Sequence, residues 1–396
     1  MPSTESNATH LPRVSLTIFL SMAFRPLYLA GALWAAISVL IWVFAPTLPS
    51  GMLQGLAWHA HEMLWGFIAA IAVGFLLTAS ATWTGINPLS GLALAFACVL
   101  WVVARLGFLM THPIAFVVAS ACQFTFLLVS AGALARVVLG AKSQRNYVLP
   151  MLVLALGATD ALFLWAIWHD DAGVALERFD SGLLCMAVIA LLVARRVIPF
   201  FAMRAIPELK IPMHESSAKV QLAAGALAVV FALAGWRLPL AVALGAIAGL
   251  CAVQLFSWKP WAVRRTPLLW ILYLGYAGIG AGFAVKSLHA LGLIQNAAVH
   301  VHVTALGGLS LLVIGMITRT ALGHLSRSLA VDTGMVASFI LLIAAFVLRL
   351  VAVIPSSLSW IFIQLSAGAW VTAFVVYAVR FWPMMIRPNA NATNRT

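Results

Sequence analysis

Runs of about twenty apolar residues recur along the whole chain, and they constrain its fold more than any other feature. A helix of about 20 residues crosses the hydrocarbon core of a bilayer. Of the 396 residues, 64% are hydrophobic and only 8% are charged, against about 25% charged in an ordinary soluble domain. This composition excludes a soluble enzyme, a disordered regulator and a secreted disulfide scaffold. Because lipid leaves no backbone polar group unpaired, the sequence predicts an all-α, polytopic integral membrane protein.

Twelve of these runs are long enough to span a bilayer, so we expect about twelve transmembrane helices in one bundle. Short connections, often marked by proline, separate them, and no linker or charge run divides the chain. We therefore predict an N-terminal segment over 1–26, a twelve-helix domain over 27–382 and a C-terminal tail over 383–396. The predicted spans are 27–45, 57–80, 89–110, 113–139, 147–168, 181–201, 217–235, 238–257, 267–287, 297–317, 333–354 and 358–379.

The positive charge of the chain sets the expected orientation. Its net charge is +13, but the basic residues stand singly or in pairs, which argues against a nucleic-acid partner. With the N-terminus inside, eighteen of the 23 Lys and Arg residues fall on the inner side, as the positive-inside rule requires. Both termini are then cytoplasmic, and the acidic loop near 169–180 is outside. The five remaining basic residues are Arg105, Arg178, Arg237, Lys286 and Arg349.

Two histidine pairs carry the strongest chemical signal. His59 and His61 begin the second predicted span, followed by Glu62, and His300 and His302 begin the tenth. Both spans run from outside to inside, so both pairs lie just below the outer surface. Ionisable groups inside spans are costly and often functional, and histidine is the usual ligand of haem iron, copper and zinc. The alternative is a set of interfacial polar residues beside the lipid headgroups.

The spacing within each pair limits what it can bind. Residues i and i+2 of a helix point about 200° apart, so two such histidines cannot chelate one metal. They serve two different sites, or one is a ligand while the other packs. His59 and Glu62, three residues apart, share a face, so the carboxylate could orient a ligand imidazole or bind copper. Within the second pair, His302 lies deeper and is the better candidate.

A similar layout occurs in haem-copper oxidases and nitric oxide reductases, where histidines of spans 2 and 10 hold two haems. Those enzymes need a further histidine cluster for a second metal, and predicted spans 6 and 7 contain no histidine. The layout therefore favours haem binding without supporting their binuclear centre.

Four other polar residues are candidates with competing explanations. Arg105 could meet a haem propionate, or it could pair with Asp160 at a similar depth. Arg319 and His324, after span 10, could bind an anion or a propionate, or could be solvated loop charges. His289, near Lys286, could be a further copper or haem ligand, or an interfacial residue.

Taken together, the motifs resemble the NnrS family over nearly the whole chain. Two of them are specific: Trp58-His59-Ala60-His61-Glu62-Met63, and Gly315-Met316-Ile317-Thr318-Arg319 followed by Gly323-His324. Supporting motifs are Phe24-Arg25-Pro26, Trp65-Gly66-Phe67, Gly74-Phe75-Leu76-Leu77-Thr78, Trp83-Thr84-Gly85 and Arg196-Val197-Ile198-Pro199-Phe200-Phe201. His300 lies outside the family motif, and Leu325-Ser326-Arg327 departs from the Thr-Gly-Arg that is more common there.

The resemblance implies a bacterial inner-membrane protein of the nitric oxide or nitrosative-stress response that carries haem and copper. We expect one or two haems of b type, with His59, His61, His302 and His289 as candidate metal ligands. His300, Glu62, Arg105, Arg319 and His324 complete the candidate cofactor-binding set. The expected partners are the lipid bilayer, a small gaseous or nitrogen-oxide ligand and an electron donor. If the protein is an enzyme, it is a haem-dependent oxidoreductase; the alternatives are a haem or copper carrier and a secondary transporter.

Overall fold

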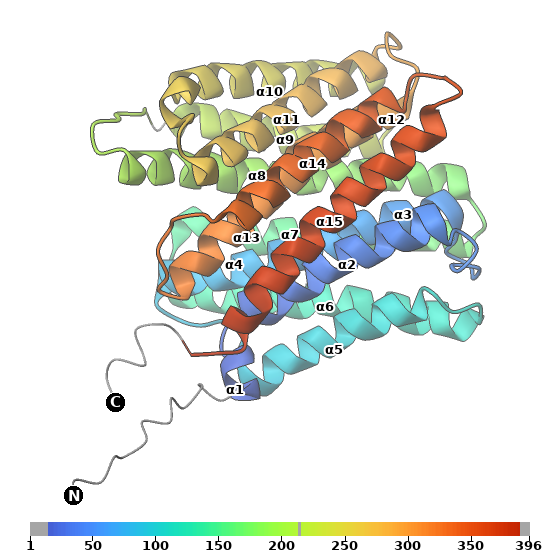
Figure 1. Cartoon of the computed structure of the whole chain (residues 1–396). Helices are drawn as coiled ribbons and strands as arrows, with labels where there is room; N and C mark the ends of the chain where they lie inside the picture. The colour runs from blue at the N-terminus through green and yellow to red at the C-terminus, as the bar shows by residue number, and fades with distance from the viewer. Residues whose placement is uncertain (1–14, 213–214, 389–396) are drawn as a thin grey trace, which may run out of the picture.

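A computed structural model describes residues 15–212 and 215–388 as a bundle of helices (Figure 1). Eleven helical segments among these residues are long and apolar enough to cross a membrane, and α5 is a shorter apolar helix of 17 residues. No strand occurs in the described ranges, so the prediction of an all-α, multi-pass membrane protein is confirmed. The helices are α1 (Leu16–Phe19), α2 (Phe24–Phe44), α3 (Gly55–His61), η1 (Glu62–Ile68), α4 (Ala69–Thr84), α5 (Gly91–Gly107), α6 (Pro113–Gly140), η2 (Gln144–Asn146), α7 (Val148–Trp168), α8 (Ala172–Ala205), α9 (Glu215–Leu233), α10 (Arg237–Ser257), η3 (Pro260–Val263), α11 (Pro267–Ala290), α12 (Ala297–His302), η4 (Val303–Ser310), α13 (Leu311–His324), α14 (Thr333–Val351) and α15 (Ser359–Met385).

The first and last described segments meet at one end of the bundle, which we call the termini end (Figure 1). There Arg25 Nη1 donates to the carbonyl oxygen of Met385 at 2.6 Å. We call the opposite end, where the connections 45–54 and 291–296 lead into α3 and α12, the histidine end. Most of the two predicted tails, with Arg13 and Arg395, lies outside the described residues.

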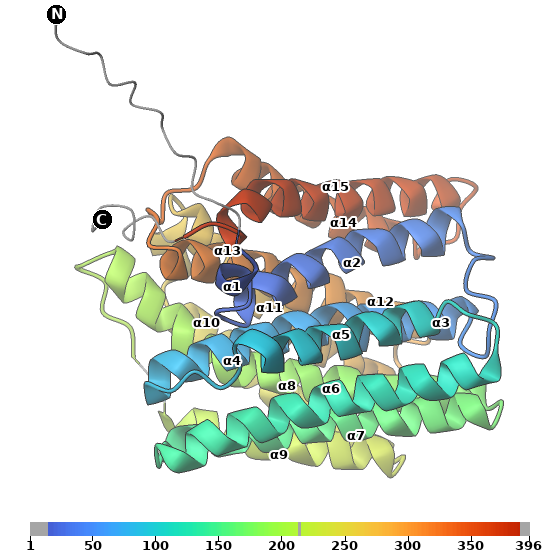
Figure 2. The same cartoon turned by 90° about the horizontal axis from the view of Figure 1, so that it is seen from below.

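Consecutive helices pack side by side from α5 to α11, and α15 returns to pack against α2 (Figure 2). The two histidine-bearing spans lie in the middle of this arrangement. In the most apolar 18-residue window of each span, 83% of the residues are buried within 55–84 and 72% within 297–324. The corresponding window in α9 is 22% buried. The histidine pairs are therefore carried by spans that the rest of the bundle covers.

Both central spans change helix type directly after their histidine pair. In each, an α-helical start that ends at the second histidine is followed by a π-helix, η1 or η4, and then by α-helix again. In η1, for example, the amide of Ala69 donates to the carbonyl of Leu64, five residues earlier. Long π-helical stretches are rare and cluster at functional sites. Each histidine pair therefore directly precedes an unusual stretch of backbone.

One boundary differs from the sequence-based expectation. We expected a loop over 169–180, but α8 begins at Ala172 and continues through Asp180. The side chain of Asp171 caps this helix, accepting a hydrogen bond from the amide of Val174 at 2.9 Å. The extension carries Asp180 on a helix rather than on a solvated loop.

Glycines allow α11 to lie very close to η4. A β-carbon on Gly278 would collide with the backbone carbonyl of Gly307, and one on Gly282 would collide with the side chain of Thr304. Small residues of this kind let membrane helices approach through their backbones.

Gly278→Ala should therefore destabilise the protein by about 1–3 kcal/mol, because the added methyl group must push two backbones apart. The matched control is Gly249→Ala on α10, where an added β-carbon meets no atom within 4 Å. Thermal unfolding of the two variants in detergent provides the comparison. Equal melting temperatures would contradict the close approach of α11 and η4.

Candidate functional site

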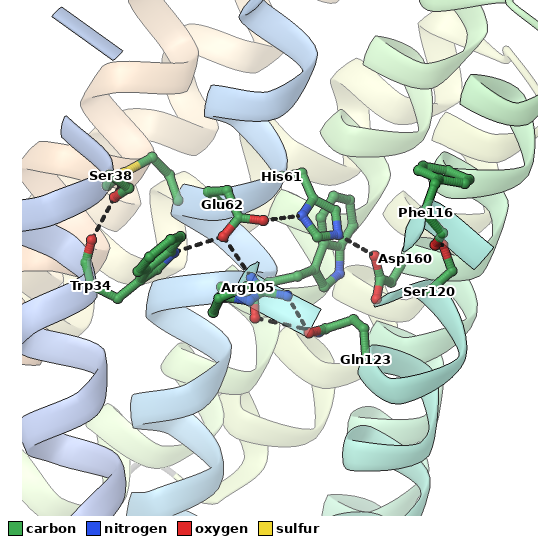
Figure 3. A network of polar contacts seen from close by, with 12 residues as sticks. Trp34, Ser38, His61, Glu62, Arg105, Phe116, Ser120, Gln123 and Asp160 are labelled. Carbon is green, nitrogen blue, oxygen red and sulfur yellow. Dashed lines mark hydrogen bonds and ion pairs between the residues drawn. The ribbon is translucent and has the colours of Figure 1, made fainter. Parts of the chain in front are cut away.

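A network of charged side chains lies inside the bundle next to His61 (Figure 3). The carboxylate of Glu62 is fully buried and accepts hydrogen bonds from Arg105 Nη1 at 2.8 Å and from Trp34 Nε1 at 2.6 Å. Arg105 Nη2 also donates to Gln123 Oε1 at 2.5 Å. These residues come from η1, α5, α2 and α6, so one buried ion pair joins four separate helices.

The imidazole of His61 lies between two carboxylates (Figure 3). Its Nδ1 is 2.8 Å from Glu62 Oε1, and its Nε2 is 3.1 Å from Asp160 Oδ1 on α7. Ionised carboxylates only accept hydrogen bonds, so His61 must carry a proton on both nitrogens to satisfy both. Its positive charge and that of Arg105 then balance the two acids. In this arrangement His61 has no lone pair to offer a metal.

These contacts differ from two sequence-based expectations. The carboxylate of Glu62 contacts the neighbouring His61, not His59, because Arg105 and Trp34 draw it toward α5 and α2. Arg105 forms its ion pair with Glu62 rather than with Asp160, whose charge acts on it without an ion pair. With its guanidinium bound by Glu62 and Gln123, Arg105 is not placed to meet a haem propionate.

Gly66, in the π-helix η1, provides the space for this ion pair. A β-carbon at this position would clash with the Arg105 guanidinium, and it would lie 2.7 Å from Glu62 Oε2 and 3.0 Å from Trp34 Nε1. The network therefore requires a residue without a side chain one helical turn after Glu62.

His59 and His302 come together at the histidine end from the two central spans. The His59 ring stacks on Trp42 at 4.8 Å between centroids, and its Nδ1 is buried without a hydrogen-bond partner. His302 Nδ1 donates to the carbonyl of Ala298 at 2.7 Å, which leaves the lone pair on Nε2 free. The two imidazoles interact electrostatically with each other and with Arg349.

His300 belongs to a second cluster beside the first. Its Nε2 lies 3.0 Å from Asp180 Oδ1, and the other oxygen of Asp180 forms an ion pair with Lys286. The His300 ring packs against His289 at 4.8 Å between centroids. His289 Nδ1 donates to the carbonyl of Ile294 at 2.7 Å, while His300 Nδ1 is buried without a partner. Each imidazole therefore keeps one nitrogen outside these hydrogen bonds.

The two members of each pair thus serve different clusters, as the i, i+2 spacing predicts. His59 interacts electrostatically with His302, while His61 turns to the ionic network and His300 turns to Asp180.

Arg319 and His324 lie at the termini end, remote from these histidines. Arg319 follows His302 by 17 residues, or roughly 25 Å along a helix. The Arg319 guanidinium packs over the ring of Phe201 at 4.0 Å, and the His324 ring lies 5.4 Å from that of Phe24. They do not share a site with His59 and His302.

Two residues at the histidine end did not enter the candidate set drawn from sequence. Arg349 is a lone charge in the last turn of the otherwise apolar α14, and that isolation is the signal that marks it. Asp180 had no such signal, because its neighbours Asp170, Asp171 and Glu177 suggested an acidic loop.

The fold and these clusters define a polytopic helical membrane protein with a neutral ionic network at its centre and imidazole donors at one end. The family model for the NnrS protein matches residues 18–389. The chain therefore belongs to the NnrS family, as its motifs indicated. No curated protein matches the chain.

The ionic network gives a direct prediction about stability. Arg105→Gln leaves the Glu62 carboxylate buried without its cation, so the free energy of unfolding should fall by about 3–5 kcal/mol. The double variant Glu62→Gln/Arg105→Gln removes both charges and should recover part of that loss. Denaturant unfolding in detergent measures both effects.

The control is Arg380→Gln, which breaks a bridge to Asp332 whose two side chains are 45% and 39% exposed. An exposed pair is worth about 0–1 kcal/mol. If Arg105→Gln cost no more than Arg380→Gln, the buried pair would not hold the bundle together.

Proposed function

We propose that this NnrS-family protein is a haem protein of the bacterial inner membrane, with copper as a second metal, acting in the nitric oxide or nitrosative-stress response. It binds or redox-processes nitrogen oxides at a haem held by His59 and His302 near the periplasmic face, with both termini in the cytoplasm. The observation that supports this most is that these two imidazoles, from spans 2 and 10, lie close enough to each other and to Arg349 to interact electrostatically.

The donor atoms at the histidine end fit such a group. Three of the buried polar atoms without a partner belong to Trp58, His59 and His300. Buried polar atoms normally find a partner in the protein, in water or in a bound ion. At His302, the hydrogen bond to Ala298 fixes the ring and leaves Nε2 as the donor, as is usual for a metal-ligating histidine.

The number of donors favours haem over a bare metal ion. No group of three or more His, Cys, Asp or Glu side chains within the described ranges could hold a metal ion. A structural zinc site needs about four protein ligands, whereas haem iron brings four nitrogens of its own and needs only axial ligands. Two imidazoles are enough for haem and too few for structural zinc.

The surrounding residues have separate roles in this proposal. Arg349 has no carboxylate partner in the described part of the chain, and its guanidinium suits a haem propionate. Trp42 fixes the plane of His59 by stacking. The network centred on His61 positions the start of the span that carries His59. When bound, the haem would supply an iron that exchanges electrons with nitrogen oxides.

Copper is assigned to His289 and His300, whose rings pack together with one nitrogen of each left outside the hydrogen bonds to Ile294 and Asp180. Imidazole nitrogen is a good ligand for copper.

The test is the visible spectrum of the purified full-length protein, oxidised and dithionite-reduced, with haem and metal content. We expect a Soret band at near-stoichiometric haem. His59→Ala and His302→Ala should each shift the band or lower the haem content at least twofold, because each removes a proposed axial ligand.

The control is His112→Ala, which alters an exposed histidine at the first turn of α6 and should leave the spectrum unchanged. Unchanged spectra in both ligand variants would overturn the assignment. A colourless, metal-free protein that remains folded would favour a transporter, and loss of haem to an apo-acceptor within minutes would favour a carrier.

A further inference from the structure

A second site, independent of the proposed haem, lies toward the termini end. An apolar cavity of about 80 Å³ separates α4 and α8 from η4 and α13. Its wall is almost wholly aliphatic, with Ala190 and Val193 from α8 facing Val313 and Met316 from the opposite span. All four are only half-buried, so the wall is not sealed by protein.

A buried cation stands at one end of this cavity. Arg319 follows the cavity residue Met316 by three positions, and Phe201 follows the cavity residue Ile198 by three. Each therefore lies on the same face of its helix, one turn nearer the termini end. The guanidinium of Arg319 lies 4.0 Å from the centre of the Phe201 ring, one turn beyond the residues that line this end of the cavity.

Arg319 lacks the partner that such a charge normally requires. The residue is 5% exposed, yet no carboxylate in the described ranges forms an ion pair with it. The charge of Arg204 acts on it and repels it. A buried charge without a counter-ion costs several kcal/mol, in contrast to Arg105, which has Glu62. A buried arginine one turn beyond an apolar cavity, with a second arginine near enough to repel it, suits an anion that carries a hydrocarbon chain.

We propose that this cavity binds one acyl chain of an anionic phospholipid, whose phosphate is held by Arg319 and Arg204. The guanidinium groups offer paired N–H donors that match phosphate oxygens. The cavity runs along α13 from Leu309 to Ile317, roughly 12 Å of helix, and accepts the part of the chain next to the headgroup. The phosphate then lies at the level where the apolar part of α13 ends.

The experiment uses the full-length protein, purified in neutral detergent and washed free of lipid. Native mass spectrometry counts bound phosphatidylglycerol and phosphatidylcholine with identical acyl chains. We expect one phosphatidylglycerol to be retained about tenfold more tightly, because the two arginines repel the choline cation that phosphatidylcholine carries next to its phosphate. Equal retention of the two lipids would overturn the proposal.

Separate variants test the headgroup contact and the cavity for the acyl chain. Arg319→Gln should abolish the preference for phosphatidylglycerol, and Arg204→Gln, at an exposed position, should weaken it about threefold even if the first variant fails to fold. Ala190→Phe fills the cavity and should lower phosphatidylglycerol retention. Arg327→Gln, in the exposed loop after α13, is the control and should change nothing.

Three results would count against the site. Equal loss in Arg327→Gln would indicate non-specific surface charge, and unchanged retention in Ala190→Phe would exclude the cavity as the place of the chain. Full displacement of the lipid by inorganic phosphate alone, at millimolar concentration, would reduce the site to a simple anion site. Because the readout is bound lipid, it is independent of haem content.

Discussion

The buried pair of Glu62 and Arg105 is the interaction on which the arrangement of the first half of the bundle depends. Charges within a bilayer are costly unless they are paired, and here a second acid, Asp160, and the imidazole of His61 complete a neutral set. The four groups come from three parts of the chain, residues 61–62, 105 and 160, so these helices cannot separate without leaving a charge in lipid. The start of the second span is held in this way, and with it His59.

Because the two histidines of a span are two residues apart, fixing one of them places the other in a separate site. With His61 fixed in the ionic network, His59 must point to the other side of the helix, toward Trp42 and His302. The tenth span has the same arrangement, since His300 is held by Asp180 and His302 faces the opposite way. In each span one histidine is fixed by a carboxylate, and its neighbour keeps an uncommitted nitrogen.

The sequence alone predicted those features of the fold and the site that a local pattern of residues determines. The multi-pass helical fold and the divergence of His59 from His61 follow from run length and helical periodicity. The partners of Glu62 could not be predicted, because Arg105 and Trp34 are separated from it by 43 and 28 residues and meet it only through packing. Asp180 was misplaced for a similar reason: a helix cap at Asp171 and a distant Lys286 decide its position, and neither leaves a hydrophobic signal.

The contrast among three arginines connects the two ends of the molecule. Arg105 is neutralised by Glu62 within the chain, whereas Arg349 at the histidine end and Arg319 at the termini end have no acidic partner in the described ranges. A chain with only ten acidic residues has few carboxylates with which to neutralise charges inside its spans. Cations that persist there imply anions from outside the chain, and the neighbours of each arginine indicate which kind. Beside Arg349, imidazoles suit the iron of the proposed haem, whose carboxylates would pair with the guanidinium. Beside Arg319, an aliphatic cavity suits the acyl chain of the proposed lipid, whose phosphate would pair with the guanidinium.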